Sequence, residues 1–148
     1  MINKYGVEFT PILCVDFDGV IHSFKSGAQG DNTIIPDPPN PGALAWLKAA
    51  MEHWDVQVYS ARSADPGAID AMKSWLLNFA IHEWGDSEEA ERFVGRLKFP
   101  TQKPPAFLMI DDRAICFEGD FSALDPEELL KFKPWYRRGR EPIGLESP

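Results

Sequence analysis

The sequence predicts an α/β protein in which helices cover both faces of a parallel β-sheet. Short, nearly continuous apolar runs alternate with longer segments that carry helix start signals, the pattern expected when parallel strands are buried on both sides. Three of these runs end in a polar residue, namely Asp16, Ser60 and Asp111. Polar side chains at the carboxyl ends of parallel strands are typical of sites in open sheets. The same edge of the sheet is therefore expected to carry function.

The strands are expected to be short. Each apolar run is bounded by polar, glycine or proline residues and is too short for a helix of ordinary length. The expected strands cover residues 11–16, 56–60, 106–111 and 115–117.

Helix starts are marked by a capping residue followed by proline. This pattern occurs at Asn40, Asp65 and Asp125, where the side chain can cap the first turn and the proline that follows loses no hydrogen bond. Asp86 is expected to cap a further helix, because Glu89 three residues later completes a capping-box pattern. The expected helices cover residues 41–54, 66–80, 87–96 and 126–132.

Length and composition are those of one globular domain. The 148 residues are 44% hydrophobic and 26% charged, which is ordinary for such a domain. We expect a core over residues 1–132 and a basic, extended tail over residues 133–148. The first residues include no long apolar stretch, so neither a signal peptide nor membrane association is expected. Cys14 and Cys116 lie in apolar runs, which indicates reduced thiols and a cytoplasmic location.

Charge is unevenly distributed along the chain. The net charge is −8, yet five of the fifteen basic side chains lie within residues 131–140. An acidic body does not bind nucleic acid nonspecifically, but it suits a protein that gathers carboxylates around a cation. The basic segment could hold a phosphate backbone with bases stacked on Trp135 and Tyr136, or it could be a solubilising tail docked on the acidic body. Its basic residues are Lys131, Lys133, Arg137, Arg138 and Arg140.

Two acids meet at the end of the first expected strand, in the sequence DFDGV. Asp16 and Asp18 would repel each other unless a cation lies near them, and a structural Ca²⁺ site or a simple surface pair is the alternative interpretation. Three further chemical groups follow in order along the chain: Ser60, Lys103 and the pair Asp111-Asp112.

This ordered set resembles the haloacid dehalogenase (HAD) superfamily of Asp-x-Asp phosphatases and phosphotransferases. DFDGV is similar to the first motif of that superfamily, and KPPAFLMIDDR is similar to its last two motifs. Receiver domains of response regulators share these residue types, but there the acid pair comes before the lysine rather than after it. The resemblance covers residues 12–113 and implies a Rossmann-like core. The segments after Asp18 and after Ser60 are too short for a large cap domain, which implies a capless member.

The resemblance implies roles for the conserved positions of those motifs. Asp16 would be the nucleophile that forms an aspartyl-phosphate, and Asp18 would be the general acid and then the general base. Mg²⁺ would be held by Asp16, the backbone carbonyl of Asp18 and an acid of the later pair, with Asp112 favoured as ligand and Asp111 behind it. The substrate phosphate would be bound by Ser60, Ala61, Arg62 and Lys103.

Three nearby residues have two interpretations each. Arg62 could contact phosphate with two parallel hydrogen bonds, or it could be a structural partner of Asp65 or of the acid pair. His22 is expected to be hydrogen-bonded within the fold rather than to contact substrate. Arg113 is expected to orient Asp111 or to pack locally rather than to bind substrate.

The function implied is that of a Mg²⁺-dependent phosphomonoester hydrolase, a HAD-type phosphatase. The Ser-x-Arg form at 60–62 and the IDDR ending are similar to the phosphatase domain of polynucleotide kinase-phosphatases, which favours nucleotides or polynucleotide ends as substrates. An uncovered site could also be closed by another subunit of a homo-oligomer. The alternative function is that of a phosphate-binding or regulatory protein with weak turnover.

Overall fold

The chain forms two compact units in the computed structural model, which describes residues 1–139. The first unit is Met1–Asp111, and the second begins at Asp112. This division falls earlier than the boundary after residue 132 that the sequence suggests. Along the described residues, no helix combines the length and apolar character needed to cross a bilayer.

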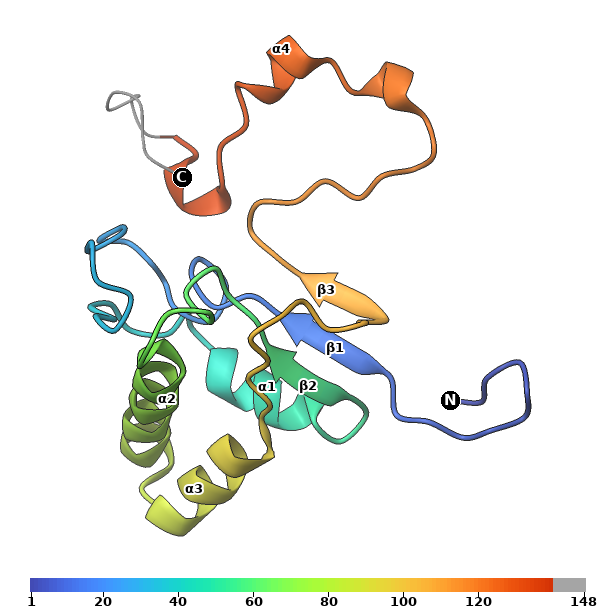
Figure 1. The fold of residues 1–148 in the computed structure, drawn as a ribbon. Helices are drawn as coiled ribbons and strands as arrows, with labels where there is room; N and C mark the ends of the chain where they lie inside the picture. Colours follow the sequence, from blue (N-terminus) through green and yellow to red (C-terminus); the bar gives the residue numbers. More distant parts are fainter. Residues whose placement is uncertain (140–148) are drawn as a thin grey trace. The chain divides into compact units, whose positions relative to one another are not determined.

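A three-stranded parallel sheet forms the centre of the first unit. Its strands are β1 (Ile12–Val15), β2 (Asp55–Val58) and β3 (Leu108–Ile110), arranged in the order β2-β1-β3 (Figure 1). Val15 on the central strand lies opposite both Val58 and Ile110, so the three strands end together. The predicted α/β class with a parallel sheet is thus confirmed. The strand expected at 115–117 is wrong, because those residues adopt no strand conformation.

All four predicted helices are present. They are α1 (Ala43–Ala50), α2 (Ala68–Trp84) and α3 (Ser87–Arg96) in the first unit and α4 (Pro126–Leu129) in the second. Helix α2 runs beyond its expected end at residue 80 and stops at Gly85. This glycine adopts the left-handed conformation (φ 65°) and its N–H donates to the Ile81 carbonyl.

Two of the predicted caps are wrong, because the sequence there forms a turn before the helix. Helices α1 and α2 begin after Gly42 and Gly67, whose φ angles are 80° and 78°, and neither helix has a side-chain cap. The Asn40 carbonyl accepts the N–H of Ala43 at 3.0 Å. Proline followed by a left-handed glycine within such a bond is the geometry of a type II turn. The same turn precedes α2.

The other two predicted caps are confirmed. The Asp86 carboxylate accepts the backbone N–H groups of Glu88 and Glu89 at the start of α3. The Asp125 carboxylate accepts the N–H of Glu127 at the start of α4, with Pro126 in the first helical turn. Helices α3 and α4 have no glycine two residues after the capping aspartate, so no type II turn forms there. The aspartate side chain therefore caps the first turn of each helix.

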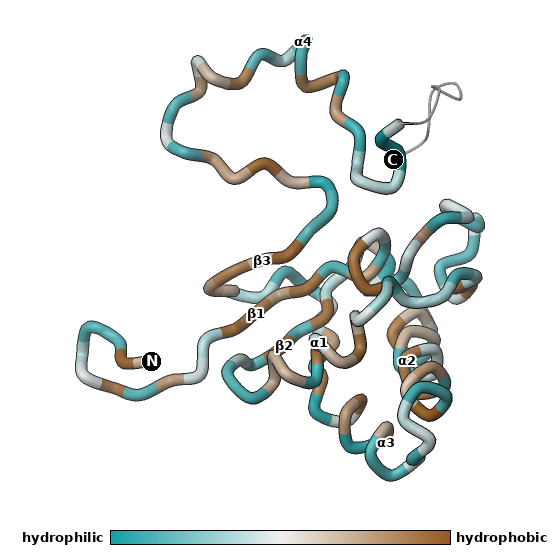
Figure 2. The backbone as a smooth tube through the Cα atoms, turned by 180° about the vertical axis from the view of Figure 1, so that it is seen from behind, coloured by the Kyte–Doolittle hydropathy of each residue, from teal (hydrophilic) through white to brown (hydrophobic). Residues whose placement is uncertain are grey.

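The hydrophobic core lies against one face of the sheet. Leu13 and Val15 of β1 share this face with Val56 and Val58 of β2, as their register requires. Figure 2 shows the hydrophobic colouring along β1 and β3. Each large apolar side chain buried here stabilises the fold by about 1.5–3 kcal/mol. Helices α1, α2 and α3 all contribute to this one cluster, through Leu44, Leu47, Met72, Leu76, Ala90 and Phe93.

The opposite face carries Cys14 and Gln57, and coil rather than helix approaches it. The chain leaving α3 runs beside β2, where Val58 donates its N–H to the Lys98 carbonyl at 2.8 Å. It then reaches β3, and the N–H of Phe107 donates to Ile12 of β1. Figure 1 shows this link between α3 and β3. The expectation of helices on both faces is therefore corrected: Cys14 is fully buried, but the three helices of the first unit pack on the other side.

The second unit contains short helical turns. Besides α4, it has 3₁₀ turns at Phe121–Ala123 and Trp135–Arg137, so the first part of the expected extended tail is turned. Lys131 pairs with Glu128, and Arg113 donates to the Tyr136 hydroxyl at 3.2 Å. Arg113 thus packs locally, one of its two expected roles. The rest of the tail, from Arg140 to residue 148, lies outside the described residues.

Backbone geometry at two glycines yields a paired prediction. Gly42→Ala should lower the free energy of unfolding by about 1 kcal/mol, because a side chain disfavours the positive φ of the turn. Gly95→Ala should raise it by about 0.5–1 kcal/mol, because this glycine lies within α3 at an ordinary φ. An added Cβ has no atom within 4 Å at either glycine, so steric clashes do not contribute to the two changes in unfolding free energy. Urea unfolding measures both changes, and equal effects of the same sign would contradict the turn assignment.

Candidate functional site

The parallel register brings Asp16 and Asp111 to the same edge of the sheet. The N–H of Asp16 donates to the Ile110 carbonyl at 2.9 Å, so the pairing of β1 with β3 continues one residue beyond the strands. Asp111 is the next residue after that carbonyl. Carboxylate oxygens of Asp16 and Asp111 lie within 4.8 Å of each other, and Asp112 is the next residue of the chain.

This group of carboxylates has the chemistry of a divalent cation site. Asp16 is half-buried, and one of its oxygens accepts the backbone N–H of Phe17 at 2.8 Å, which orients the side chain. Clustered carboxylate oxygens repel one another in the absence of a cation and are the ligands that hard cations such as Mg²⁺ prefer. These carboxylates could therefore hold a metal ion.

Lys103 acts on the same region from the coil before β3. Burial raises the pKa of the Cys14 thiol, the negative charges of Asp16 and Asp111 raise it further, and the positive charge of Lys103 opposes them. The charges of Asp16, Asp111 and Lys103 therefore all act on the buried thiol of Cys14. Lys103 is exposed and forms no hydrogen bond or ion pair with the part of the chain that the structure describes, so its ammonium group has no fixed protein partner there.

Asp18 is held by Arg62. The guanidinium Nε donates to Oδ2 of Asp18 at 2.9 Å and an Nη donates to Oδ1 at 2.8 Å, the paired geometry that suits arginine and carboxylate. The other Nη donates to the carbonyls of Asn32 and Ile34. Arg62 is 5% exposed. The structural partner of Arg62 is therefore Asp18, and neither Asp65 nor the acid pair makes this contact.

His22 holds Asp18 from a second direction. Its Nδ1 lies 2.8 Å from Oδ1 of Asp18, and its Nε2 accepts the backbone N–H of Asp37 at 3.1 Å. The ring is fully buried. The expectation that His22 is hydrogen-bonded within the fold is confirmed.

The sequence predicts Ser60 at the end of its strand, but β2 stops at Val58 and Ser60 lies two residues later, buried in the turn that follows. Its hydroxyl oxygen accepts the N–H of Arg62 at 3.3 Å, which leaves the hydroxyl proton available to a ligand oxygen. Its own N–H donates to the hydroxyl of Ser63 at 2.9 Å, so the two serines close the turn after the strand. Ala61, between them, is exposed and offers its backbone to solvent.

Sequence reasoning missed the contributions of Asn32, Asp37 and Ser63. Asn32 and Asp37 belong to the long segment after β1, and nothing in their spacing predicts contact with Arg62 or His22. Ser63 follows Ser60 by three residues, which is a usable signal for a turn closed by a hydroxyl.

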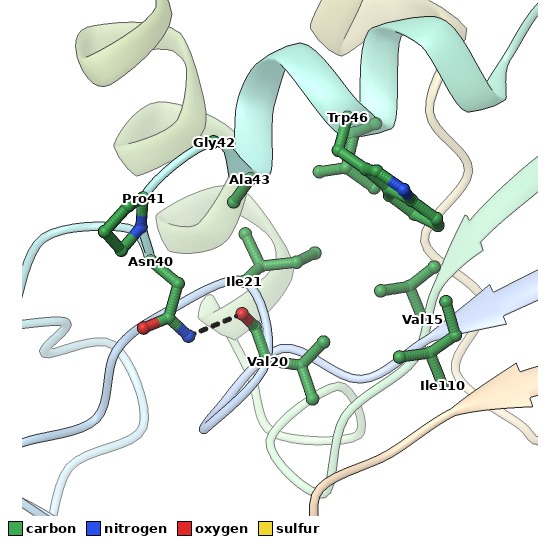
Figure 3. Close-up of a pocket in the computed structure, with 10 residues that line it drawn as sticks. Val15, Val20, Ile21, Asn40, Pro41, Gly42, Ala43, Trp46 and Ile110 are labelled. Carbon is green, nitrogen blue, oxygen red and sulfur yellow. Dashed lines mark hydrogen bonds between the residues drawn. The ribbon is translucent and has the colours of Figure 1, made fainter.

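An apolar pocket of about 400 Å³ lies on the other side of the sheet from the acid cluster. Val15 and Ile110 line it with Trp46 of α1, as Figure 3 shows. Side chains alternate along a strand, so Asp16 points away from the face that Val15 presents. The pocket is therefore separate from the carboxylates.

Comparison of the chain with models of protein families, with curated proteins and with solved structures gives no match. The superfamily assignment accordingly stays a prediction that depends on the residues described above.

Metal addition provides a test that does not depend on activity. Adding Mg²⁺ to metal-free protein should raise the free energy of unfolding by RT ln(1 + [Mg²⁺]/Kd), because the cation binds the folded carboxylate cluster. Asp111→Asn should weaken the response to Mg²⁺, since it removes one carboxylate from the cluster. Asp70→Asn on the exposed start of α2 is the control and should keep that response. A melting temperature unchanged by Mg²⁺ would contradict the site.

The segment after β1 gives a prediction about pH. Partial burial raises the pKa of Asp37, but hydrogen bonds from the hydroxyl and N–H of Ser26, with smaller contributions from His22 and Lys25, hold it below its ordinary value. Such a group stabilises the fold above the ordinary aspartate pKa of about 4, and this stabilisation is lost as pH falls through the lowered value. Ser26→Ala should therefore cost about 1 kcal/mol at pH 6, and the difference from wild type should shrink towards pH 3. A difference in unfolding free energy that grows on acidification would contradict this assignment.

Proposed function

We propose that the protein is a Mg²⁺-dependent phosphomonoester hydrolase of HAD type that acts through an aspartyl-phosphate on Asp16. The observation that carries the proposal is the convergence of Asp16 and Asp111 at one end of the parallel strands, in the electrostatic environment of Lys103. The order of these groups along the chain, with Ser60 between them, supports the same interpretation.

Each residue has a task in this proposal. The Asp16 carboxylate attacks phosphorus, the bond from phosphorus to the leaving oxygen breaks, and Asp18 donates a proton to that oxygen. Asp18 then accepts a proton from the water that attacks the phosphoenzyme, which releases inorganic phosphate and restores Asp16. Ser60 and Lys103 bind the phosphoryl oxygens. A bound Mg²⁺ would neutralise charge between the carboxylate and the phosphate, held by Asp16 and by the acids that follow β3.

The natural substrate belongs to the same proposal. Nucleotides and polynucleotide ends are the first substrate class to test, because the Ser60-x-Arg62 and IDDR sequences are similar to the phosphatase domain of polynucleotide kinase-phosphatases. The role of Arg62 in binding phosphate is less well supported than that of Ser60, since four donor contacts of its guanidinium already go to Asp18, Asn32 and Ile34.

A second candidate function is a phosphate-binding or regulatory protein of weak turnover. Its support is that both oxygens of Asp18 accept hydrogen bonds from Arg62, and one also contacts His22. An acid that must give a proton to a leaving group has to be released from such contacts. Asp18→Asn separates the candidates, because a binding protein should retain its affinity for inorganic phosphate and has no turnover to lose.

Turnover should be measured with Mg²⁺ on p-nitrophenyl phosphate, nucleotides and 3′-phosphorylated oligonucleotides. Asp16→Asn should abolish turnover, whereas Asp18→Asn should lower kcat by about 10²–10⁴-fold and affect alkyl phosphates most, because their leaving groups depend most on a proton. Asp70→Asn serves as the matched control and should leave kcat unchanged. Phosphatase activity that persists in Asp16→Asn, or no activity of the wild type on any phosphomonoester, would refute the proposal.

A further inference from the structure

Asp18 depends on a histidine that lies outside the motif residues. His22 follows Asp18 by four residues, and its position is fixed by the backbone on both sides. The N–H of His22 donates to the Phe17 carbonyl at 2.9 Å, and its carbonyl accepts the N–H of Gly19 at 2.8 Å. The neighbouring N–H of Ser23 donates to Pro38 at 3.0 Å. These hydrogen bonds fix the backbone of His22 and so limit the movement of its imidazole ring.

Aromatic rings enclose the imidazole. Phe17 stacks on it with ring centroids 5.6 Å apart, while Trp75 and Phe24 meet it edge-on at 5.6 and 5.8 Å. Phe24 takes a positive φ of 57°, an uncommon conformation for a residue with a bulky side chain. A backbone conformation of this kind persists only where surrounding contacts hold it. The ring plane of His22 is therefore fixed, with Nδ1 facing Asp18 and Nε2 facing the N–H of Asp37.

The partners assign the position of the ring proton. The N–H of Asp37 donates to Nε2 at 3.1 Å, whereas Oδ2 of Asp37 lies 3.6 Å from the same nitrogen, beyond hydrogen-bond length, so the closer contact favours a bare Nε2. In a neutral ring the proton then lies on Nδ1, 2.8 Å from Oδ1 of Asp18, and Nδ1–H donates to the carboxylate. The N–H of Asp37 selects the tautomer that Asp18 needs.

We infer that His22 is a positioning residue for Asp18, which it holds through Nδ1–H while the backbone N–H of Asp37 fixes its tautomer. This inference rests on the proposed function, because Asp18 is the general acid and base of that reaction. Arg62 holds the same carboxylate from its other side. The segment from His22 to Asp37 therefore influences the orientation of Asp18 through the ring of His22. Neither His22 nor Asp37 takes part in the chemical step itself.

Nitrogen chemical shifts of histidine test the arrangement without any substrate. In ¹⁵N-histidine-labelled protein, the neutral ring of His22 should show a protonated Nδ1 and a bare Nε2. The Nδ1 proton should give a slowly exchanging downfield signal that is lost in Asp18→Ala and kept in His82→Asn, a change at an exposed site on α2. Any proton found on Nε2 of His22 would overturn the inference.

Kinetics of matched variants test the consequence for Asp18. Asparagine can place an amide N–H near the position of Nδ1, whereas glutamine replaces the Nε2 side of the ring. His22→Gln and His22→Ala should lower kcat by about 100-fold with KM for p-nitrophenyl phosphate nearly unchanged, and His22→Asn should keep at least about a tenth of wild-type kcat. His82→Asn should behave as wild type. Equal losses in His22→Asn and His22→Gln would overturn the positioning role.

The nitrogen chemical shifts test the contact between His22 and Asp18, whereas the kinetics also test the proposed phosphatase activity. Absence of turnover by the wild-type protein would remove the proposed function, whereas the nitrogen shifts would still decide how His22 meets Asp18. If His22→Ala does not fold, the asparagine and glutamine variants and the wild-type shifts provide the decision.

Discussion

The parallel pairing of β1 between β2 and β3 is the constraint on which the rest of the structure depends. The pairing continues past the strands: Asp16 donates its N–H to Ile110, and Tyr59 donates its N–H to Val15. Residues that directly follow the three strands therefore meet at one edge, although long stretches of chain separate them. A slip of register by one residue would turn the side chains of a strand to the opposite face and disperse the carboxylates.

The two acids of DFDGV are stabilised by different means, which explains how one short stretch tolerates both. Phe17 between them is fully buried and keeps them apart. Asp18 is neutralised within the protein, since Arg62 contacts both of its oxygens and His22 contacts one. Asp16 lies close to Asp111, accepts the N–H of Phe17, and in the proposed reaction shares a cation with Asp111. In the proposed reaction this difference suits the two roles, because one acid is positioned while the other receives the phosphoryl group.

The coil that carries Lys103 also explains the asymmetry of the sheet. Three prolines at positions 100, 104 and 105 remove backbone donors and disfavour a helix in this link. A helix would cover the face of Cys14 with a continuous apolar stripe, whereas the coil covers that face and still leaves Lys103 exposed. The helices then pack together on the other face, around Leu13 and Val15.

Sequence by itself determined the elements with strong local signals. Interactions between near neighbours in the chain account for the apolar runs that became β1, β2 and β3 and for the caps at Asp86 and Asp125. They also account for Asp16 and Asp111, which directly follow β1 and β3. The run at 115–117 failed because a three-residue apolar stretch becomes a strand only where a partner pairs with it. Asn40 and Asp65 do not cap a helix, because the glycine two residues after each of them favours a type II turn before the helix begins.

Only the tertiary structure decided which partners the charged side chains found. Arg62 lies 44 residues beyond Asp18, and Asp37 lies 15 residues beyond His22, so no local pattern records either contact. Their geometry depends on how the loop after β1 folds back across the end of β2. Packing for this reason made Asp18 the partner of Arg62, and it brought the N–H of Asp37 to Nε2 of His22.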